Sequence, residues 1–272
     1  MSGSDANVPM VTFNASLFDR AADLYDESPP FFQQQGRMLV EFTNLPVGAQ
    51  VLDVGSGKGA VVLPALDAVG LTGTVTAVDV SEEMVRHLRG YGLPGLSVHQ
   101  ADVAALPLAD GSCDHATSGF TFHILSDTAG AFREVARVLR PGGTLCWSMP
   151  GTHPDANEWQ QAYGEIYARF SSRLPQMPTE MSPEHDLDAA ITNAGFEVLE
   201  QTSNAVSIPV GDAEGYWAWT QSHGVRWLTD ALDTKGAAEL KAAVISSLVE
   251  QHPTQGRDIM VAPTFFRLAK VE

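Results

Sequence analysis

The sequence predicts an α/β fold: a doubly wound, mostly parallel sheet with helical insertions. Three observations support this prediction. Apolar strand-like runs alternate with amphipathic helix-like runs between residues 50 and 151. Glycines at alternate positions directly follow the first apolar run, which indicates a tight strand-to-helix turn. Beyond residue 151 the alternation gives way to aromatic and Pro-interrupted helical blocks, which are typical of insertions around a sheet.

The first half of the predicted sheet begins with the run VLDV at residues 51–54. The turn GSGKG follows it and leads into an Ala-rich helix. The next strand, TVTAVDVS, spans residues 74–81 and precedes EEMVRHLRGYG, a helix with one apolar face that ends at its glycines. This strand–helix–strand order predicts parallel neighbouring strands.

The second half continues the same pattern. SVHQADVAALP predicts the third strand, CDHATSGFTFHIL the fourth strand with its loop, and TAGAFREVARVLRPGG a helix that stops at Pro and Gly. TLCWSMPG predicts the fifth strand, and the late run IMVAPTFFRLAKV an antiparallel C-terminal strand.

We interpret the chain as a single domain over residues 1–272. Its predicted parts are an N-terminal helical cover at 1–48, a cofactor-binding core at 49–151, helical cap insertions at 152–194 and 211–255, and closing strands at 195–210 and 256–272. Because caps at the carboxyl ends of parallel strands line the ligand crevice, we expect the insertions to select the substrate.

The composition indicates a globular protein that acts on a small molecule. The chain has 272 residues, 44% of them hydrophobic, and a formal net charge of −17. Nucleic acids and anionic membranes are bound by clustered Lys and Arg, so we expect neither as a partner. The N-terminal MSGSDANVPM lacks the apolar core of a secretory signal, and no apolar run approaches the ~20 residues of a membrane helix. We therefore predict a cytoplasmic protein, with its oligomeric state left open.

The two cysteines do not suggest a metal site or a disulfide. Cys113 and Cys146 lie in apolar stretches without a neighbouring Cys or His, which favours buried packing thiols. No cluster of His and acidic residues has the spacing of metal ligands, so we expect no metal.

The glycine-rich turn predicts a nucleotide-like cofactor, because its backbone can approach a ligand closely and helix N-terminal amides point at it. A nicotinamide dinucleotide is one possibility: Gly55, Gly57 and Ala60 fit its fingerprint, and Asp79 ends the second strand about 20 residues later. S-adenosylmethionine is the other.

Further features distinguish the two cofactors. Asp53 precedes the glycines as D-x-G-x-G-x-G, Asp102 follows the third strand in ADV, and LRPGG precedes the fifth strand. At these residues the sequence resembles the class I S-adenosylmethionine-dependent methyltransferases, which have a Rossmann-like fold, and most closely their ubiquinone/menaquinone methyltransferase-like branch. The resemblance covers residues 13–150 well and 151–255 poorly.

The resemblance implies a role for each residue near the cofactor. At the methionyl end, Asp53 would orient the ammonium group, and a turn of small residues would leave room for the ligand: Gly55, Ser56 and Gly57. Further contacts at this end and the sulfonium would come from Tyr25, Arg37, Ser118, Gly119 and Phe120. At the adenosyl end, Asp79 would accept from both ribose hydroxyls, and the adenine would contact Val80, Met84, Asp102 and Val103.

Several of these residues have a purely structural alternative. Asp79 is a possible helix N-cap, although Ser81 is better placed for that role. Asp102 is suited to capping a turn, and Tyr25 to the apolar face of a surface helix. Lys58 stands where the family usually has a small or apolar residue, and a solvated side chain is its simplest interpretation.

His123 is the predicted general base, because it follows the fourth strand and so lies near the expected methyl group. His223 and His153, in the caps, are the next candidates. The alternative for His123 is a structural role.

Aromatic residues recur at near-helical spacing in both caps: Trp159, Tyr163, Tyr167, Phe170, Tyr216, Trp217, Trp219 and Trp227. They predict an apolar pocket for a hydrophobic or aromatic metabolite, although most of such a stripe usually packs in a core. We therefore predict a small-molecule methyltransferase of secondary metabolism, with O-methylation ahead of N- or C-methylation. The alternatives are a protein of this fold that promotes a cyclisation and, less favoured, a nicotinamide-dependent oxidoreductase.

Overall fold

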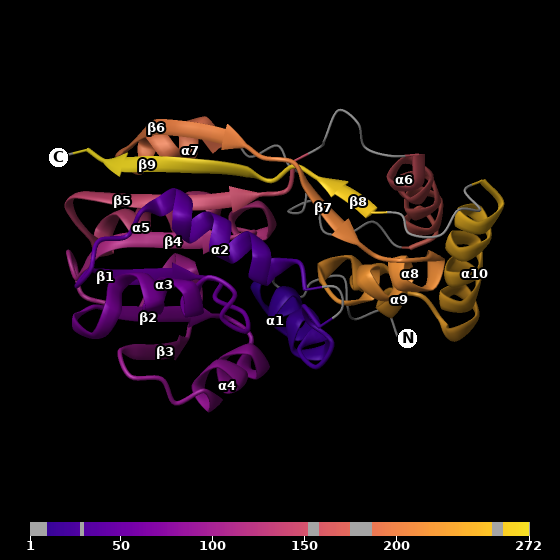
Figure 1. Ribbon diagram of the computed structural model, residues 1–272, viewed down its shortest axis with the longest axis horizontal. Helices are drawn as coiled ribbons and strands as arrows, with labels where there is room; N and C mark the ends of the chain where they lie inside the picture. Colours follow the sequence, from indigo (N-terminus) through magenta and orange to yellow (C-terminus); the bar gives the residue numbers. More distant parts are fainter. Residues whose placement is uncertain (1–9, 28–29, 152–157, 175–186, 252–257, 272) are drawn as a thin grey trace.

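A computed structural model describes all residues except 1–9, 28–29, 152–157, 175–186, 252–257 and 272. Figure 1 shows a sheet flanked by helices and, beyond the ends of its strands, a smaller cap of helices and a two-stranded ribbon. Helix α1 (Met10–Ala21) lies between the two parts.

The main sheet has seven strands in the order β3-β2-β1-β4-β5-β9-β6. β9 is antiparallel to both of its neighbours, and the pairs from β3 to β5 are parallel. This confirms the predicted doubly wound, mostly parallel sheet with an antiparallel C-terminal strand. The bounds are β1 Gln50–Val54, β2 Thr74–Asp79, β3 Leu96–Gln100, β4 Cys113–Gly119, β5 Leu139–Met149, β6 Phe196–Ser203 and β9 Thr264–Lys270.

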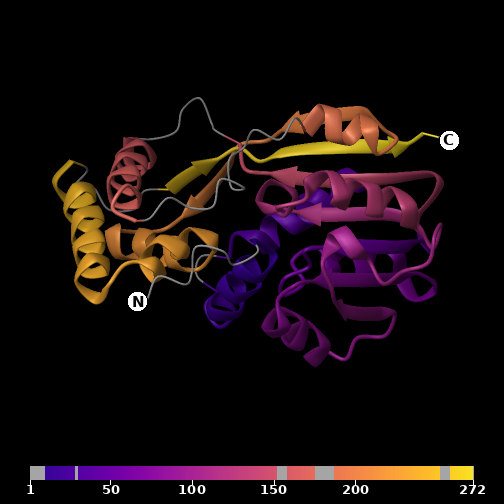
Figure 2. The same ribbon diagram turned by 180° about the vertical axis from the view of Figure 1, so that it is seen from behind.

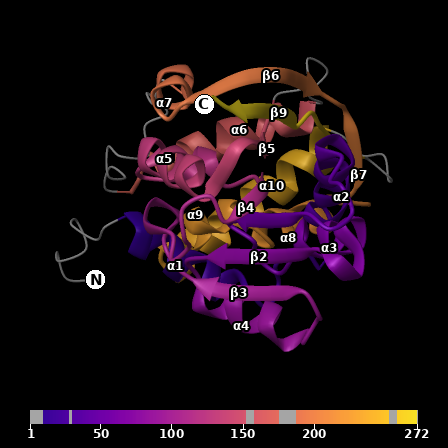
Figure 3. The ribbon, with the colours of Figure 1, turned by 90° about the vertical axis from the view of Figure 1, so that its left-hand side faces the viewer.

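Helices cover both faces of the sheet, as Figure 2 and Figure 3 show. On one face lie α2 (Phe32–Thr43), α3 (Val62–Val69) and α4 (Glu82–Gly90), whose apolar residues pack with β1 and β2. On the other face lie α5 (Thr128–Val138) and α7 (Leu187–Asn193). The two faces form because consecutive side chains of a strand point to opposite sides.

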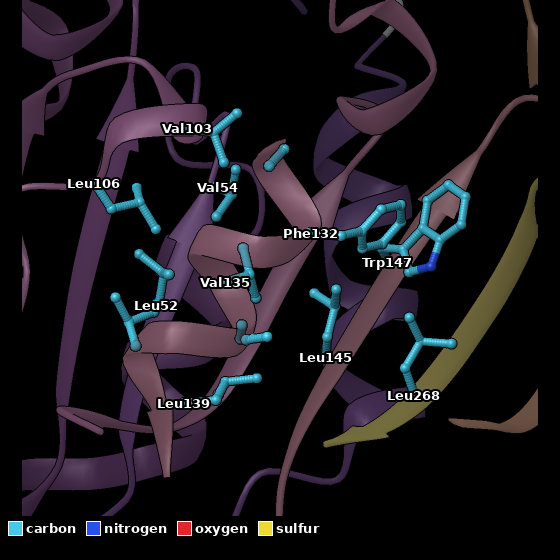
Figure 4. Close-up of a cluster of buried hydrophobic side chains, with 14 of the residues drawn as sticks. Leu52, Val54, Val103, Leu106, Phe132, Val135, Leu139, Leu145, Trp147 and Leu268 are labelled. Carbon is cyan, nitrogen blue, oxygen red and sulfur yellow. The ribbon is translucent and has the colours of Figure 1, made fainter. Parts of the chain in front are cut away.

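The face under α5 holds the largest aromatic side chains of the core (Figure 4). Leu52 and Val54, alternate residues of β1, point toward α5, which supplies Phe132 to the same cluster. The Trp147 ring of β5 stacks on Phe266 of β9 with ring centroids 4.5 Å apart. The antiparallel strand is thus held by aromatic packing as well as by its ladder.

The predicted closing strands are not continuous. The segment 195–210 forms β6 and then β7 (Val206–Pro209), and 256–272 forms β8 (Asp258–Val261) and then β9. β7 and β8 pair only with each other, as the ribbon that reaches into the cap (Figure 1). Pro263, which has no N–H for a ladder, separates β8 from β9, and the Ser203 hydroxyl donates to the nearby carbonyl oxygens instead.

The cap has an apolar core of its own, which includes Phe170, Tyr216 and Leu240. Its helices are α6 (Glu158–Ser171), α8 (Ala213–Gln221), α9 (Trp227–Ala231) and α10 (Thr234–Gln251). Helix α7 lies within the segment predicted as the first insertion, 152–194, yet it packs on α5 through Ile191. That segment therefore contributes one helix to the layers around the sheet.

The predicted N-terminal cover, 1–48, contains two helices with different positions. Helix α2 packs on one face of the sheet, whereas α1 is held by hydrogen bonds to two loops at the carboxyl ends of the strands. Asp19 of α1 accepts hydrogen bonds from the Ser81 hydroxyl (2.6 Å) and the Glu83 amide (3.1 Å), and the Asn14 amide donates to the Ile124 carbonyl (2.9 Å). Helix α1 thus bridges the loops that follow β2 and β4.

Candidate active site

The glycine turn leaves the carboxyl end of β1 and is tied to β2. The amides of Gly55 and Ser56 both donate to the Val78 carbonyl, at 2.8 and 3.1 Å. Gly55, Gly57 and Gly59 all have positive φ, at 68°, 49° and 95°. The sequence needs glycine here because other residues rarely adopt this backbone conformation.

The space around the turn differs from the prediction at Gly55. A Cβ at Gly55 would lie 2.1 Å from the Thr121 hydroxyl oxygen, so this glycine makes room for the β4 loop, not only for a ligand. A Cβ at Gly57 would meet only the Tyr25 ring, at 3.8 Å. Gly57 is therefore the glycine that faces open space under Tyr25.

Asp79 at the end of β2 organises this turn. One carboxylate oxygen accepts from the Gly57 amide at 2.8 Å and the other from the Ser81 amide at 2.9 Å. The Ser81 side chain accepts from the Met84 amide and so caps α4, which rules out the alternative of Asp79 as that cap. Burial raises the pKa of Asp79, while the backbone amides at Ser81 and Gly57 oppose the shift.

A cavity beside β2 brings together the residues predicted for the adenosyl end. We call it the β2 cavity. Asp102 accepts from the Ala104 amide through Oδ1 at 2.9 Å, so it does cap the short helix Val103–Ala105, but its second oxygen is left for a ligand. The residues lining this cavity include Asn14, Phe18, Gly57, Asp79, Val80, Met84, Asp102, Val103 and Leu125.

A second cavity, of about 750 Å³, extends from the turn along α2. We call it the α2 cavity, and its lining includes Gln35, Arg37, Ser56, Gly57, Lys58, Gly119 and Ser148. Lys58 is not the solvated side chain expected from the sequence. Its ammonium group lies 3.3 Å from the Tyr25 carbonyl oxygen and 3.8 Å from the Glu27 carboxylate, so it fixes the loop that carries Tyr25.

Two residues predicted at the methionyl end, Asp53 before the turn and Ser56 within it, have buried polar atoms without hydrogen-bond partners. Asp53 accepts from the Thr117 hydroxyl at 2.7 Å through one oxygen, and its other oxygen has no partner among the described residues. The buried Ser56 hydroxyl has none either. Burial raises the pKa of Asp53 to about 7. Asp53 is not among the described residues that line the three cavities.

Ser118 does not have the predicted position. Its side chain is fully buried and its hydroxyl donates to the Val54 carbonyl at 2.9 Å, so it joins β4 to β1. Because successive side chains of a strand point to opposite faces of the sheet, the Ser118 side chain does not follow the direction of its neighbours in β4. Gly119 lines the β2 and α2 cavities, and Phe120 also lines a third one.

This third cavity, of about 370 Å³, lies between the strand edge and the cap. We call it the cap cavity. Its lining includes Phe18, Tyr25, Phe31, Phe32, Phe120, His123, Trp219, His223 and Trp227. None of its described lining residues is Asp, Glu, Lys or Arg. The other cap aromatics with described side chains, such as Tyr216, pack in the core of the cap, and the Trp159 side chain lies outside the described part.

Tyr25 and Phe120 line all three cavities and so mark the point where they meet. The Tyr25 ring stacks on Phe32 at 4.9 Å, and Phe32 meets Phe120 edge-on at 5.7 Å. Asp26 begins α2 by accepting from the Phe32 and Gln33 amides, which fixes the chain directly after Tyr25. Molecules in the β2 and cap cavities would therefore approach each other between these rings.

Both described candidate histidines line the cap cavity. Desolvation lowers the pKa of His123 to about 4, although the residue as a whole is exposed. The same desolvation lowers the pKa of His223 to about 4, and its ring packs on Trp219 at 4.6 Å. Both rings are neutral at neutral pH and able to accept a proton. His153 lies outside the described residues.

Sequence reasoning missed two residues of the α2 cavity, Gln35 and Ser148. Both are buried with side-chain atoms that lack partners among the described residues. The available signal was a polar residue on the apolar face of α2, four positions before Leu39. In the described parts of the chain there is no cluster of three potential metal ligands and no helix long and apolar enough to cross a membrane.

Comparison with known proteins identifies a domain family. Residues 52–147 match the methyltransferase domain family. The nocamycin O-methyltransferase of Saccharothrix syringae is 28% identical over 85% of this chain and 89% of its own length. The ubiquinone/menaquinone biosynthesis C-methyltransferase of Escherichia coli is 29% identical over 60% of this chain and 72% of its own.

Solved structures share the fold. A methyltransferase from Bacillus halodurans superposes with a TM-score of 0.58 over 88% of this chain and 100% of its own, at 19% identity. The cyclase SpnF superposes with a TM-score of 0.53 over 88% of this chain and 81% of its own, at 22% identity. Both support the Rossmann-like fold predicted from the sequence.

The residues present fit S-adenosylmethionine. Asp79 has a lone pair on each oxygen for two ribose hydroxyls, and Val80 and Met84 supply an apolar surface for a purine ring. The unpartnered Ser56 hydroxyl lines the α2 cavity, where an ammonium group would meet it, and the buried Asp53 carboxylate three residues earlier in the chain supplies negative charge. Arg37 opens onto the α2 cavity, where a carboxylate would meet it.

Replacing Asp79 with Ala should weaken the binding of S-adenosylhomocysteine by about 1–3 kcal/mol, because charge-assisted hydrogen bonds to the ribose are lost. The apo protein should also unfold more readily, since the Gly57 and Ser81 amides lose their acceptor. Isothermal titration calorimetry and thermal unfolding measure the two effects. Asp67→Ala, on the exposed side of α3, is the control. An unchanged affinity would limit Asp79 to holding the turn.

The raised pKa of Asp53 should make cofactor binding depend on pH. A cationic ligand favours the ionised carboxylate, which forms as the pH rises through about 7, so affinity should increase with pH in that range. Calorimetry about one pH unit below and above this value, in buffers of different ionisation enthalpy, should show proton release on binding. Asp53→Asn should abolish both effects. Equal proton release from the variant would assign the titration to another group.

Proposed function

Because this chain belongs to the class I S-adenosylmethionine-dependent methyltransferases, we propose that it methylates an oxygen atom of a small, uncharged, hydrophobic or aromatic metabolite. The observation that carries the proposal is the lining of the cap cavity. It combines aromatic rings with two neutral histidines, without a charged side chain among its described residues, in a protein whose net charge is −17.

An uncharged cavity favours an uncharged acceptor. Transfer of a charged group from water into apolar surroundings is costly unless an opposite charge pairs with it, and the described lining offers no such partner. Aromatic rings provide flat apolar contact at little cost in side-chain entropy, which suits a planar or alicyclic ligand. The lining therefore favours a hydroxyl or enol acceptor over a charged amine.

The bound cofactor supplies a methyl group activated by a positively charged sulfur. The chain's own contribution is to hold an acceptor in the cap cavity so that its oxygen lies in line, about 3 Å from that methyl group. Tyr25 and Phe120 border the junction where the two ligands would meet. The apolar rings there also exclude water from the junction.

His123 is proposed to accept the proton of the acceptor hydroxyl. A pKa near 4 makes it a weak base, but the hydroxyl proton becomes strongly acidic as the new bond to oxygen forms. A weak base close to the oxygen therefore suffices. The same low pKa keeps the ring neutral, and so competent, throughout the physiological range.

Two other chemistries define the alternatives. N- or C-methylation needs a neutral amine or a stabilised carbanion in the same cavity. Cyclisation without methyl transfer is the second, and the likeness to the cyclase SpnF supports it only at the level of fold. The match to the methyltransferase domain family argues against the third alternative, a nicotinamide-dependent oxidoreductase. Similarity to a nocamycin O-methyltransferase supports O-methylation and a tailoring role in secondary metabolism.

Incubating the protein with methyl-labelled S-adenosylmethionine and an extract of its host should place label in a hydrophobic, uncharged metabolite. Mass spectrometry of the labelled product identifies the methylated atom, because an O-methyl ether or ester fragments differently from an N- or C-methyl group. A labelled charged amine would contradict the proposed acceptor class. A substrate consumed without any gain in mass would establish the cyclisation alternative.

The role of His123 can be tested by its pH profile. Because only the neutral ring accepts a proton, kcat should stay level from neutral pH downward and fall only as the pH approaches about 4. His123→Ala should lower kcat by about 10²-fold or more, with little change in cofactor affinity. His99→Ala, on the edge strand β3, is the matched control. A variant with full activity would contradict this role. A wild-type inflection near the ordinary histidine value of about 6.5 that is absent from the variant would keep the role and contradict the lowered pKa.

A further inference from the structure

Three buried, unpartnered polar side chains, which we call the buried polar layer, lie between α2 and the ends of the strands, in helix α2, the glycine turn and strand β5. Gln35 of α2 is only 1% exposed, and both its amide oxygen and its amide nitrogen lack hydrogen-bond partners among the described residues. The hydroxyl groups of Ser148 on β5 and Ser56 in the glycine turn are buried and unpartnered in the same way. All three residues line the α2 cavity.

The packing of α2 places this layer directly against the glycine turn. A Cβ at Gly36 would lie 2.0 Å from the Ala60 carbonyl oxygen, so the helix backbone touches the segment that follows the turn. Ser148 is the register partner of Gly119 across β4 and β5, which places its hydroxyl at the same strand edge. The polar atoms therefore come from three separate elements that line the same cavity.

The surroundings make the layer unusual. On this face of the sheet, α2 and α3 pack through buried apolar side chains such as Leu39 and Val62, against Cys146 of β5 and its neighbours. Nearly all buried polar groups in proteins are hydrogen-bonded, and an amide that lacks both partners lowers the stability of the fold. A group of such atoms lining one cavity indicates that a bound molecule supplies the missing partners.

We propose that Gln35, together with Ser148 and Ser56, binds the amino-acid end of the cofactor. A primary amide both donates and accepts, and so do hydroxyl groups, which matches a ligand end that carries a carboxylate beside an ammonium group. The buried Asp53 carboxylate, just before the turn, is the negative partner for the ammonium group. Arg37, which lines the α2 cavity, is the positive partner for the carboxylate. Gln35 supplies a neutral contact in the same cavity as Arg37. The inference depends on the cofactor of the family and not on the acceptor.

The test compares two ligands that differ only at this end. S-adenosylhomocysteine carries the amino-acid group, whereas 5′-methylthioadenosine lacks it and keeps the adenosyl part. Calorimetry with Gln35→Leu should show at least about a tenfold loss of affinity for the first ligand and no loss for the second. Gln34→Leu, the same change at an exposed position of α2 outside the described cavity linings, should alter neither.

A second measurement separates binding from structural damage. Because Gln35→Leu removes two unpartnered buried polar atoms, the melting temperature of the apo variant should be equal to or higher than that of the wild type. Gln35→Met, which is unbranched, provides the same test if leucine does not fit the site. An affinity for S-adenosylhomocysteine equal to the wild type, or an equal loss for both ligands, would overturn the proposal.

Discussion

The carboxylate of Asp79 joins the two backbone segments from which the rest of the site is built. It accepts from the glycine turn after β1 through Gly57 and from the loop after β2 through Ser81. Ser81 in turn caps α4 and donates to Asp19, which draws α1 over the strand edge. One buried acid therefore sets the shape of the turn, the start of a helix and the position of the cover, and still retains lone pairs for a ligand.

The spaces proposed here for cofactor and acceptor are separate cavities that share two aromatic lining residues, Tyr25 and Phe120. Their positions depend on contacts from distant parts of the chain. Lys58 of the turn binds the Tyr25 carbonyl, and Asp230 of α9 forms ion pairs with Arg20 of α1 and Arg226 of the cap. These charged side chains form their interactions outside the cap cavity, and its described lining contains no Asp, Glu, Lys or Arg. Such a lining suits an uncharged acceptor.

Around the glycine turn, several buried polar atoms have no hydrogen-bond partner among the described residues. They belong to Asp53, Ser56, Gln35 and Ser148. Such atoms lower the stability of the apo fold, and their retention at one strand edge is consistent with a site built to be completed by a zwitterionic ligand. The residues that lower the stability of the apo fold would then be the ones that contribute to ligand binding.

The sequence alone determined the sheet, the turn and the adenosyl side of the site, because strand periodicity, glycine spacing and an acid at a strand end are local features. VLDVGSGKG and Asp79 lie together in any right-handed βαβ unit. Tertiary structure alone decided the rest. Ser118 turned inward to bind β1, the closing strands divided at Pro263, and Gln35 of α2 came to line the same cavity as Ser148 of β5. Each outcome depends on how elements far apart in the chain pack together, and side-chain environment at such contacts is set by the partner surface and not by the local residue pattern.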